Sequence, residues 1–155
     1  MAPAYNEEAN IVENIRSLLT INYPSYEIVI INDGSKDGTL ERLIKNFHLV
    51  EDDSLYFNFI PTKEIRKVYK SKSKSFKNLK VIDKENGGKS DALNAGINIC
   101  KHSIISSIDV DCILDSDALL KLIKPFLNNK KKVIASGGVI RIANSCIIED
   151  GKIIE

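Results

Sequence analysis

Residues 106–111 read Ser-Ser-Ile-Asp-Val-Asp, an apolar run that ends in two carboxylates one residue apart. We expect Ile104 to Ile108 to form a buried strand that delivers Asp109 and Asp111 to the carboxyl edge of a sheet. Open α/β sheets bind their ligands at that edge. Two carboxylates in such a place suit a divalent cation that also holds a diphosphate. The stretch therefore predicts both the class of fold and the position of a ligand site.

Short apolar segments alternate with amphipathic segments along the rest of the chain. Apolar residues three and four apart indicate helices, and β-branched runs bounded by turn residues indicate strands. The expected helices cover residues 7–19, 37–47, 90–101 and 115–127, and the expected strands cover residues 27–31, 81–82, 104–108 and 133–139. Residues 145–155 are expected to form a hairpin that turns at Glu149-Asp150-Gly151. All-apolar strands between helices predict an α/β fold with a mostly parallel sheet that helices cover on both faces.

The composition is that of a soluble globular domain. The chain has 155 residues, which is enough for one domain with its own core. Its net charge of +1 gives no reason to expect nucleic acid as a partner. The cysteines lack C-x-x-C pairing and fit reduced thiols rather than disulfides or a zinc site; they are Cys100, Cys112 and Cys146. Neither a signal peptide nor an apolar run of about 20 residues is present, so we expect the chain as given to be soluble and intracellular.

Residues 49–79 lack a clear period, and much of the positive charge lies there. From Thr62 to Lys80 there are eight basic residues and one acidic residue, Glu64. The basic residues are Lys63, Arg66, Lys67, Lys70, Lys72, Lys74, Lys77 and Lys80. One interpretation is a solvated surface insertion, because charged runs are usually solvated. The other is a loop that contacts anionic lipid headgroups, where each basic residue adds about 1 kcal/mol.

Four short motifs follow one another between residues 3 and 111. They are Pro3-Ala4-Tyr5-Asn6-Glu7-Glu8, Asn32-Asp33-Gly34-Ser35, Asn86-Gly87-Gly88-Lys89-Ser90-Asp91-Ala92-Leu93-Asn94 and Asp109-Val110-Asp111. In these motifs the chain resembles the family 2 glycosyltransferases, which are inverting, nucleotide-sugar-dependent enzymes of the GT-A fold. The basic segment and residues 137–144 resemble the membrane-associated, polysaccharide-synthase-like members.

The resemblance implies a nucleotide-sugar site with a base end and a diphosphate end. At the base end, Pro3 and Tyr5 would line the uracil pocket, and Asp33 would accept the imino N–H of the base in a charge-assisted hydrogen bond. Glu7, in the first motif, is also expected to contact the nucleotide sugar. Asn32 stands where many relatives have a second Asp, so one carboxylate of the usual pair is missing. Without the other motifs, the segments around Pro3 and Asp33 would be read only as turns.

At the diphosphate end, Lys89 follows two glycines at a helix start and would bring a cation near the phosphates. Asp109 would bind the ribose and share with Asp111 an Mg²⁺ or Mn²⁺ ion that bridges the diphosphate. Such an ion stabilises the leaving nucleoside diphosphate as a Lewis acid. Taken alone, Lys89 would be a solvated lysine, and the two aspartates would be the start of a loop.

The chain also departs from the family pattern at both ends. Only Met1-Ala2 precede the first motif, where relatives have a central strand, so we expect a gap between the strands that end at Asn32 and at Asp109. The family's catalytic base lies in a motif that this chain does not reach, and Glu149 and Asp150 do not match it. An inverting displacement needs a general base, so no catalytic residue is assigned in this chain. We therefore expect a GT-A fold that is truncated at both ends.

Two hypotheses of function remain open. In the first, residues 1–155 are the donor-binding half of a family 2 catalytic domain, with a basic insertion near residues 49–79. The enzyme would transfer a sugar from a UDP-sugar to a saccharide or lipid-linked acceptor in cell-envelope or extracellular polysaccharide synthesis. It would work in the cytoplasm at the inner face of the membrane, and this portion alone would be inactive. In the second hypothesis, the chain is a non-catalytic module that binds a nucleoside diphosphate or a partner, or an inactive fragment, and it turns nothing over.

Overall fold

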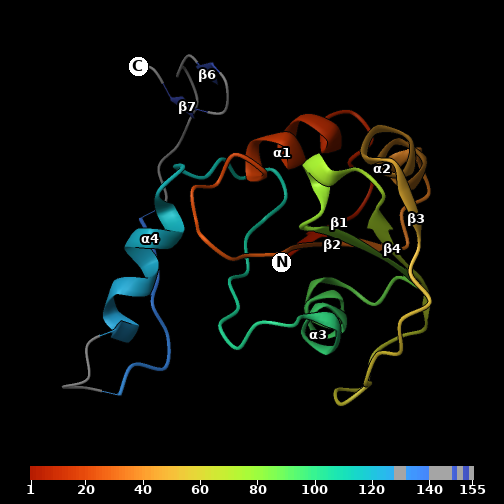
Figure 1. Cartoon of the computed structure of the whole chain (residues 1–155). Helices are drawn as coiled ribbons and strands as arrows, with labels where there is room; N and C mark the ends of the chain where they lie inside the picture. Colours follow the sequence, from red (N-terminus) through yellow and green to blue (C-terminus); the bar gives the residue numbers. More distant parts are fainter. Residues whose placement is uncertain (128–131, 140–147, 150–151, 154–155) are drawn as a thin grey trace. The chain divides into compact units, whose positions relative to one another are not determined.

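Five strands form one sheet in the order β1-β2-β5-β4-β3 (Figure 1). The computed structural model describes residues 1–127, 132–139, 148–149 and 152–153. The chain divides into two compact units, one of residues 1–15 and 26–112 and one of residues 16–25 and 113–155. The sheet belongs to the first unit, which also holds every residue of the expected ligand site.

The strands of this sheet run mostly in one direction. Their bounds are β1 Ala2–Ala4, β2 Ile28–Asp33, β5 Leu79–Lys84, β4 Ile65–Ser71 and β3 Leu49–Glu51. β1 pairs parallel with β2, and β2 pairs parallel with β5. β4 is antiparallel to both of its neighbours and is therefore the reversed strand of this sheet. The predicted α/β fold with a mostly parallel sheet is confirmed.

Helices lie on both faces of the sheet (Figure 1). α2 (Thr39–Phe47) and residues 11–15 of α1 (Ile11–Leu18) lie over one face, and α3 (Lys89–Ile99) packs against β1, β2 and β5 on the other. The three helices expected in this part of the chain are therefore confirmed. α2 begins two residues after Asp37, whose carboxylate accepts the backbone N–H of Thr39 at 3.1 Å and so satisfies one of the free donors of the first turn.

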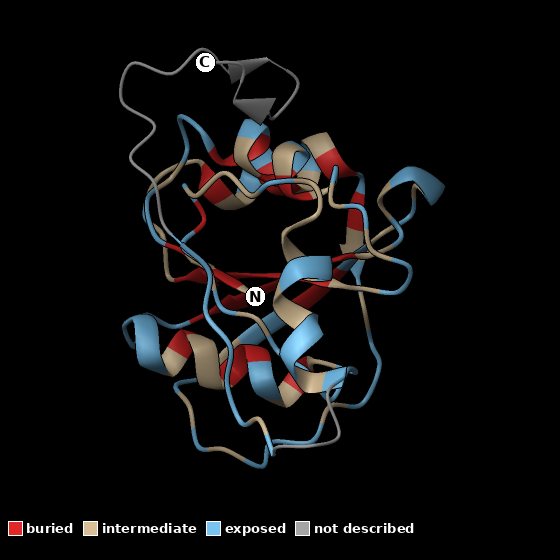
Figure 2. Cartoon of the chain, turned by 90° about the vertical axis from the view of Figure 1, so that its left-hand side faces the viewer, coloured by how far each residue is buried: buried red, intermediate tan, exposed pale blue. Residues whose placement is uncertain are grey.

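The core follows from the alternation of side chains along the strands. Val29 and Ile31 of β2 pack in one cluster with Ala92 and Ile99 of α3. Ile30 lies between the two β2 residues in sequence and is also fully buried, which places it on the opposite face of the sheet. Figure 2 shows the strands as the buried layer between the helices. Burial on both faces explains why β2 reads as a continuous apolar run.

The expected strand at residues 104–108 and the expected gap beside it are both wrong. These residues are irregular, although Met1 N donates to Ser106 O at 2.8 Å and Ile108 N donates to Met1 O at 3.1 Å. Two such bonds are the pattern of a single parallel bridge. Residues 106–108 therefore lie beside the start of β1, and β1 occupies the place where a gap was expected. With one bridge only, the apolar run does not become a regular strand.

Residues 49–79 are more than a surface insertion, because they supply β3, β4 and the short helix η1 (Lys74–Phe76). Val68 and Tyr69 are both buried although they are adjacent in β4. The pairing of β4 with β5 shifts register between Ile65 and Lys67, as in a β-bulge. The pairing is regular from Lys67 to Lys70, so Val68 and Tyr69 are buried on opposite faces of the sheet and this part of β4 shows no alternation of apolar and polar residues.

Residues 52–64 connect β3 to β4, and a side chain of α3 holds part of this loop. The side-chain amide of Asn98 accepts from Ile60 N at 3.0 Å and donates to Ile60 O at 2.8 Å. Phe57 and Phe59 are exposed, and their rings stack with centroids 5.5 Å apart. The backbone of this part of the loop is therefore fixed while its aromatic side chains face solvent.

The second unit contains α4 (Ala118–Ile123) and η2 (Lys124–Leu127), which confirm the helix expected at residues 115–127. β6 (Ile148–Glu149) pairs antiparallel with β7 (Lys152–Ile153), as expected for the hairpin. In the described part of the chain, no helix is both long enough and apolar enough to span a bilayer.

The strand expected at residues 133–139 is wrong. These residues are irregular, and Ile134 and Val139 are 87% and 88% exposed. An apolar run forms a strand only when a neighbour takes its backbone hydrogen bonds, and no strand is paired with residues 133–139 where the structure describes them. Residues 140–144 of the family-like stretch and Cys146 lie outside the described residues.

Asp52 anchors the start of the loop between β3 and β4. Its side chain is 6% exposed and accepts hydrogen bonds from Lys70 Nζ at 2.9 Å and from Ser54 Oγ and Tyr56 Oη, both at 2.7 Å. Burial raises the pKa of Asp52, but the hydrogen bonds and the Lys70 charge outweigh burial and hold the pKa below its ordinary value. The charged carboxylate thus stabilises the folded chain.

We expect Asp52→Asn to flatten the acid dependence of folding stability. The folded-state pKa of Asp52 is depressed, so its contribution is present above the unfolded pKa of about 3.9 and is lost as pH falls below it. Urea unfolding at about pH 5 and about pH 3 measures the effect. Asp53→Asn, at the exposed neighbouring position, is the control and should leave the slope unchanged. An unchanged slope in Asp52→Asn would contradict the assignment.

Candidate functional site

The residues expected to bind the donor line one cleft of about 530 Å³ at the carboxyl ends of β1 and β2. The cleft is lined by Pro3, Ala4, Tyr5, Glu7, Asp33, Asn86, Gly88, Lys89, Asp109, Val110 and Asp111. The first motif begins within β1 and continues past its end, the second begins with the last two residues of β2, and the third leads into α3. Parallel strands deliver the residues at their carboxyl ends to one edge of the sheet. The structure therefore brings all seven predicted site residues together.

Two loops frame the base end of the cleft and are hydrogen-bonded to each other. Asn6 has a left-handed backbone with φ 56°, and its N–H donates to Ser35 Oγ at 2.9 Å. Asparagine is one of the few residues besides glycine that readily adopts this conformation. Glu7 N donates to Thr39 Oγ1 at 2.9 Å. Tyr5 precedes this anchor and is 46% exposed, so part of its ring is available to a ligand.

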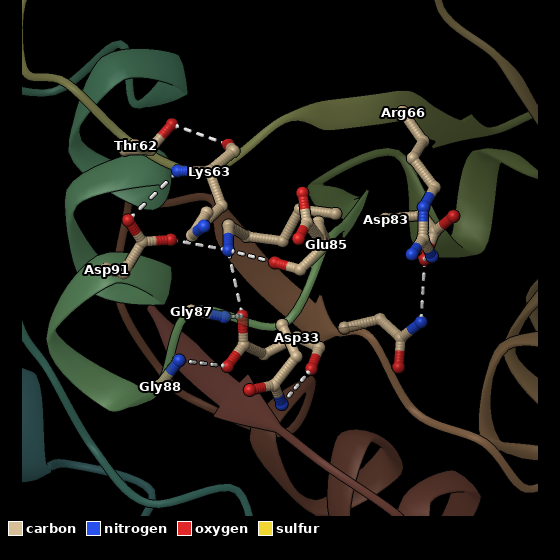
Figure 3. Close-up of polar contacts among 12 residues, drawn as sticks. Asp33, Thr62, Lys63, Arg66, Asp83, Glu85, Gly87, Gly88 and Asp91 are labelled. Atoms are coloured by element: carbon tan, nitrogen blue, oxygen red, sulfur yellow. Dashed lines mark hydrogen bonds and ion pairs between the residues drawn. The ribbon is translucent and has the colours of Figure 1, made fainter.

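Asp33 is almost fully buried at the end of β2 and receives three hydrogen bonds (Figure 3). Oδ1 accepts from Lys84 Nζ at 2.8 Å and from Gly87 N at 3.0 Å, and Oδ2 accepts from Gly88 N at 2.8 Å. A carboxylate has about four lone-pair sites. Oδ2 therefore keeps one site for a donor group of a ligand in the cleft.

The second and third motifs touch at Gly34. This residue has φ +70°, and a Cβ there would lie 2.7 Å from the backbone N of Asn86. The side-chain amide of Asn86 donates to Asp33 O at 2.7 Å. The missing side chain at Gly34 allows this close approach, which fixes the loop of residues 86–88 against the end of β2.

Asn32, at the position where the family resemblance implies a second carboxylate, has a partner of its own. It is 2% exposed, and its Nδ2 donates to Asp83 Oδ1 at 2.8 Å. Asn32 and Asp83 lie opposite each other in the β2–β5 register. Arg66 lies near the same Asp83 oxygen, at 3.7 Å. An aspartate at position 32 would face the Asp83 carboxylate in a buried place, whereas the amide donates to it, although Asn32 Oδ1 has no hydrogen-bond partner among the described residues.

The diphosphate end of the cleft contains an ion pair between Lys89 and Asp109. The Asp109 carboxylate is the largest cause of a raised pKa for Lys89, so the lysine carries its charge. Both side chains are more than half exposed. An exposed pair of this kind contributes little to stability, and the ammonium is free to exchange its carboxylate for another anion.

Carboxylates gather beside this ion pair. Burial, and then the negative charges of Asp111 and Asp37, raise the pKa of Glu7. Among the described residues, no group of three or more His, Cys, Asp or Glu side chains is arranged to hold a metal. Mg²⁺ commonly takes one or two carboxylates and completes its shell with phosphate oxygens and water. Asp109 and Asp111 fit that kind of ion, which would share the cleft with a diphosphate.

Sequence reasoning missed Lys84 and Asp91, which support the cleft from behind. Lys84 is fully buried and pairs with Asp33 and with Asp91 Oδ2. Asp91 is part of the third motif, but the family resemblance gives it no role. Lys84 lies two residues before that motif. Asp33 and Lys84 are the last residues of two parallel strands and are direct partners in the β2–β5 register. Aligning the ends of these two strands in the sequence would therefore have placed Lys84 beside Asp33.

The sequence matches the family described as Glycosyl transferase family 2 over residues 1–55 and 61–145. All four motifs fall inside the match. Residues 56–60, which include the exposed Phe57 and Phe59, fall between its two parts. The loop between β3 and β4 thus differs in length or sequence from the family pattern.

The chain is similar to two staphylococcal proteins named poly-beta-1,6-N-acetyl-D-glucosamine synthase. It is 32% identical over 145 residues to the one from Staphylococcus epidermidis. It is 31% identical over 144 residues to the one from Staphylococcus aureus (strain COL). Each alignment covers 93% of this chain and 28% of the synthase, so the chain spans less than a third of the length of these relatives.

The fold is similar to that of a solved structure, S. aureus TarS 1-349. The TM-score is 0.56 at 21% sequence identity, and the match covers 90% of this chain and 37% of that chain. This likeness supports the sheet and helix arrangement described above. Because the family match takes in all four motifs and most of the chain, the chain belongs to glycosyl transferase family 2 and has its GT-A fold.

Proposed function

We propose that this chain binds the donor of an inverting glycosyltransferase that makes a polysaccharide, and that the donor is a UDP-sugar. The observation that carries the proposal is the cleft, which brings together residues of four separate motifs to which the family resemblance gives roles at the base and at the diphosphate. The names of the two staphylococcal relatives make UDP-N-acetylglucosamine the first donor to test. The acceptor would be a saccharide or a lipid-linked saccharide, and the proposal assigns no catalytic base in this chain.

At the base end, Asp33 would select uracil. The N3 atom of uracil carries a hydrogen, whereas the N3 atom of cytosine is an acceptor. The open site on Asp33 Oδ2 suits the first and repels the second, because an ionised carboxylate only accepts. The exposed part of the Tyr5 ring offers a face for stacking, and Pro3 holds the neighbouring backbone rigid.

At the diphosphate end, Asp109 and Asp111 would hold an Mg²⁺ or Mn²⁺ ion, and Asp109 would also contact the ribose. When bound, the ion stabilises the negative charge of the leaving nucleoside diphosphate. Lys89 would release Asp109 and place its ammonium beside the phosphates. The dipole of α3 adds a favourable potential at the same place, since Lys89 is the first residue of the helix.

We also propose that the whole protein works in the cytoplasm, at the inner face of the membrane. Exposed lysines at positions 72, 74 and 77, around η1, support this location. Each basic residue near an anionic surface contributes about 1 kcal/mol. Co-sedimentation with vesicles of phosphatidylcholine, with and without phosphatidylserine, tests this part of the proposal separately from donor binding.

Calorimetric titration of the chain with UDP, with and without Mn²⁺, tests the donor site. We expect Mn²⁺-dependent binding that is stronger for UDP than for CDP. Asp33→Asn should weaken UDP binding by about 10-fold or more, since a hydrogen bond to a charged group contributes about 1.5–3 kcal/mol. Absence of UDP binding, or equal affinity for UDP and CDP, would overturn the proposal. Hydrolysis of UDP-N-acetylglucosamine by the chain would distinguish an enzyme from a binding module.

A further inference from the structure

Lys84 is the last residue of β5 and is 0% exposed. Its ammonium donates to Asp33 Oδ1 at 2.8 Å and to Glu85 O at 2.5 Å, and it pairs with Asp91 Oδ2 at 2.5 Å (Figure 3). A lysine ammonium has three donors and no acceptor. Two of these donors make hydrogen bonds, and the charge of the ammonium is also paired with the Asp91 carboxylate.

The charge of Lys84 is secured by its two carboxylate neighbours. Burial lowers the pKa of Lys84, but Asp33 and Asp91 outweigh burial and raise the pKa above its usual value. Burial also raises the pKa of Asp91, and the Lys84 ammonium outweighs it and lowers that pKa. The three groups thus form a charged cluster beneath the cleft. A buried ion that loses all of its partners is strongly unfavourable, and Lys84 has two carboxylate partners, of which Asp33 is the one that lines the cleft.

Lys84 does not line the cleft, and its direct contact with a residue that does is the one with Asp33. Together with Gly87, it takes both lone-pair sites of Asp33 Oδ1. This leaves Oδ2, which receives Gly88 N, as the oxygen with an open site. We propose that Lys84 is a positioning residue that orients the Asp33 carboxylate so that Oδ2 faces the donor base and selects uracil. This inference rests on the proposed function of Asp33.

Asp91 anchors the other side of Lys84 in the first turn of α3. Its Oδ1 accepts from Lys63 N at 3.0 Å, so the cluster also reaches the loop before β4. Asp91 does not line the cleft. It is therefore the matched control, because its loss removes one of the two carboxylate partners of Lys84 but leaves the Lys84–Asp33 contact in place.

The test compares UDP and CDP binding, with Mn²⁺, by calorimetry in wild type, Lys84→Met, Asp91→Asn and Asp33→Asn. Damage to the fold would weaken both nucleotides equally, whereas a misplaced Asp33 changes their ratio. We expect Lys84→Met to reduce the preference for UDP over CDP by about 10-fold. Asp91→Asn should keep the wild-type preference. In Asp33→Asn, adding Lys84→Met should change the preference no further, since both act through one carboxylate.

The outcomes separate this inference from the proposed function. A wild-type preference in Lys84→Met would overturn the positioning role, provided that Asp33→Asn loses it. No UDP preference in the wild-type chain would overturn the proposed function first. In Lys84→Met, both Asp33 and Asp91 lose their cation, and the variant could fail to fold for that reason. In that case Lys84→Met/Asp91→Asn carries the same test, because only the Asp33 carboxylate is then left without a cation. Unchanged preference in that double variant would equally overturn the inference.

Discussion

Asp111→Asn is expected to weaken Mn²⁺-dependent UDP binding by about 30-fold. The amide keeps the size of the side chain but removes the charge that would bind the ion. Loss of one partner from a close charge pair costs about 2 kcal/mol at the lower end of the observed range, which is about 30-fold in affinity. We choose the lower end because Asp111 is exposed in the free cleft. Calorimetry with UDP at saturating and at zero Mn²⁺ measures the effect.

Two control measurements test whether the loss of affinity comes from the metal ion. The residual binding of Asp111→Asn should respond little to Mn²⁺, whereas its affinity without the metal should match that of wild type. Asp53→Asn changes the net charge by the same amount at an exposed position outside the cleft, and it should bind UDP as wild type does. Undiminished Mn²⁺-dependent binding in Asp111→Asn would remove this residue from the metal site.

Phe47→Ala is expected to have the largest effect on folding. Phe47 ends α2, is 0% exposed and meets the ring of Phe76 edge-on at 5.2 Å between centroids. Truncating a buried phenylalanine costs about 3–5 kcal/mol, because apolar contacts are lost and a cavity remains. For a chain of this size that lowers the melting temperature by about 10 °C. Thermal and urea unfolding measure the loss.

Phe59→Ala is the matched control for this substitution. It removes the same atoms, but Phe59 is 80% exposed, so the stability should change by less than about 0.5 kcal/mol. Phe47 lies outside the cleft, so the folded fraction of Phe47→Ala should bind UDP normally. A loss of stability below about 1 kcal/mol would contradict the place of Phe47 in the core.

β2 and its end of the cleft could be predicted from sequence because local signals and tertiary structure agree there. Residues 28–31 are apolar and β-branched, and the turn residues that follow them end the strand where a ligand site is expected. Parallel strands that end in polar motifs then place those motifs at one edge. The same argument does not account for Asp109, because the residues before it are irregular; the family resemblance is what grouped Asp109 with Asp33.

The failures have a common physical cause, because strands depend on partners that lie far away in the sequence. Residues 104–108 and 133–139 are as apolar as true strands but lack a full set of backbone partners in the described structure. β4 has such partners, but its two buried residues, Val68 and Tyr69, are adjacent and lie among charged residues, so its sequence shows no strand period. Lys84 was missed for the same reason, since its importance depends on a carboxylate 51 residues away.

The hydrogen bond between Asn32 and Asp83 has a consequence for how this site could have evolved. The resemblance to the family implies two acids at the end of the strand that corresponds to β2, whereas this chain has one there and one opposite it on β5. Two carboxylates this close in a buried place would repel each other. We therefore expect the residue types tolerated at positions 32 and 83 to depend on each other.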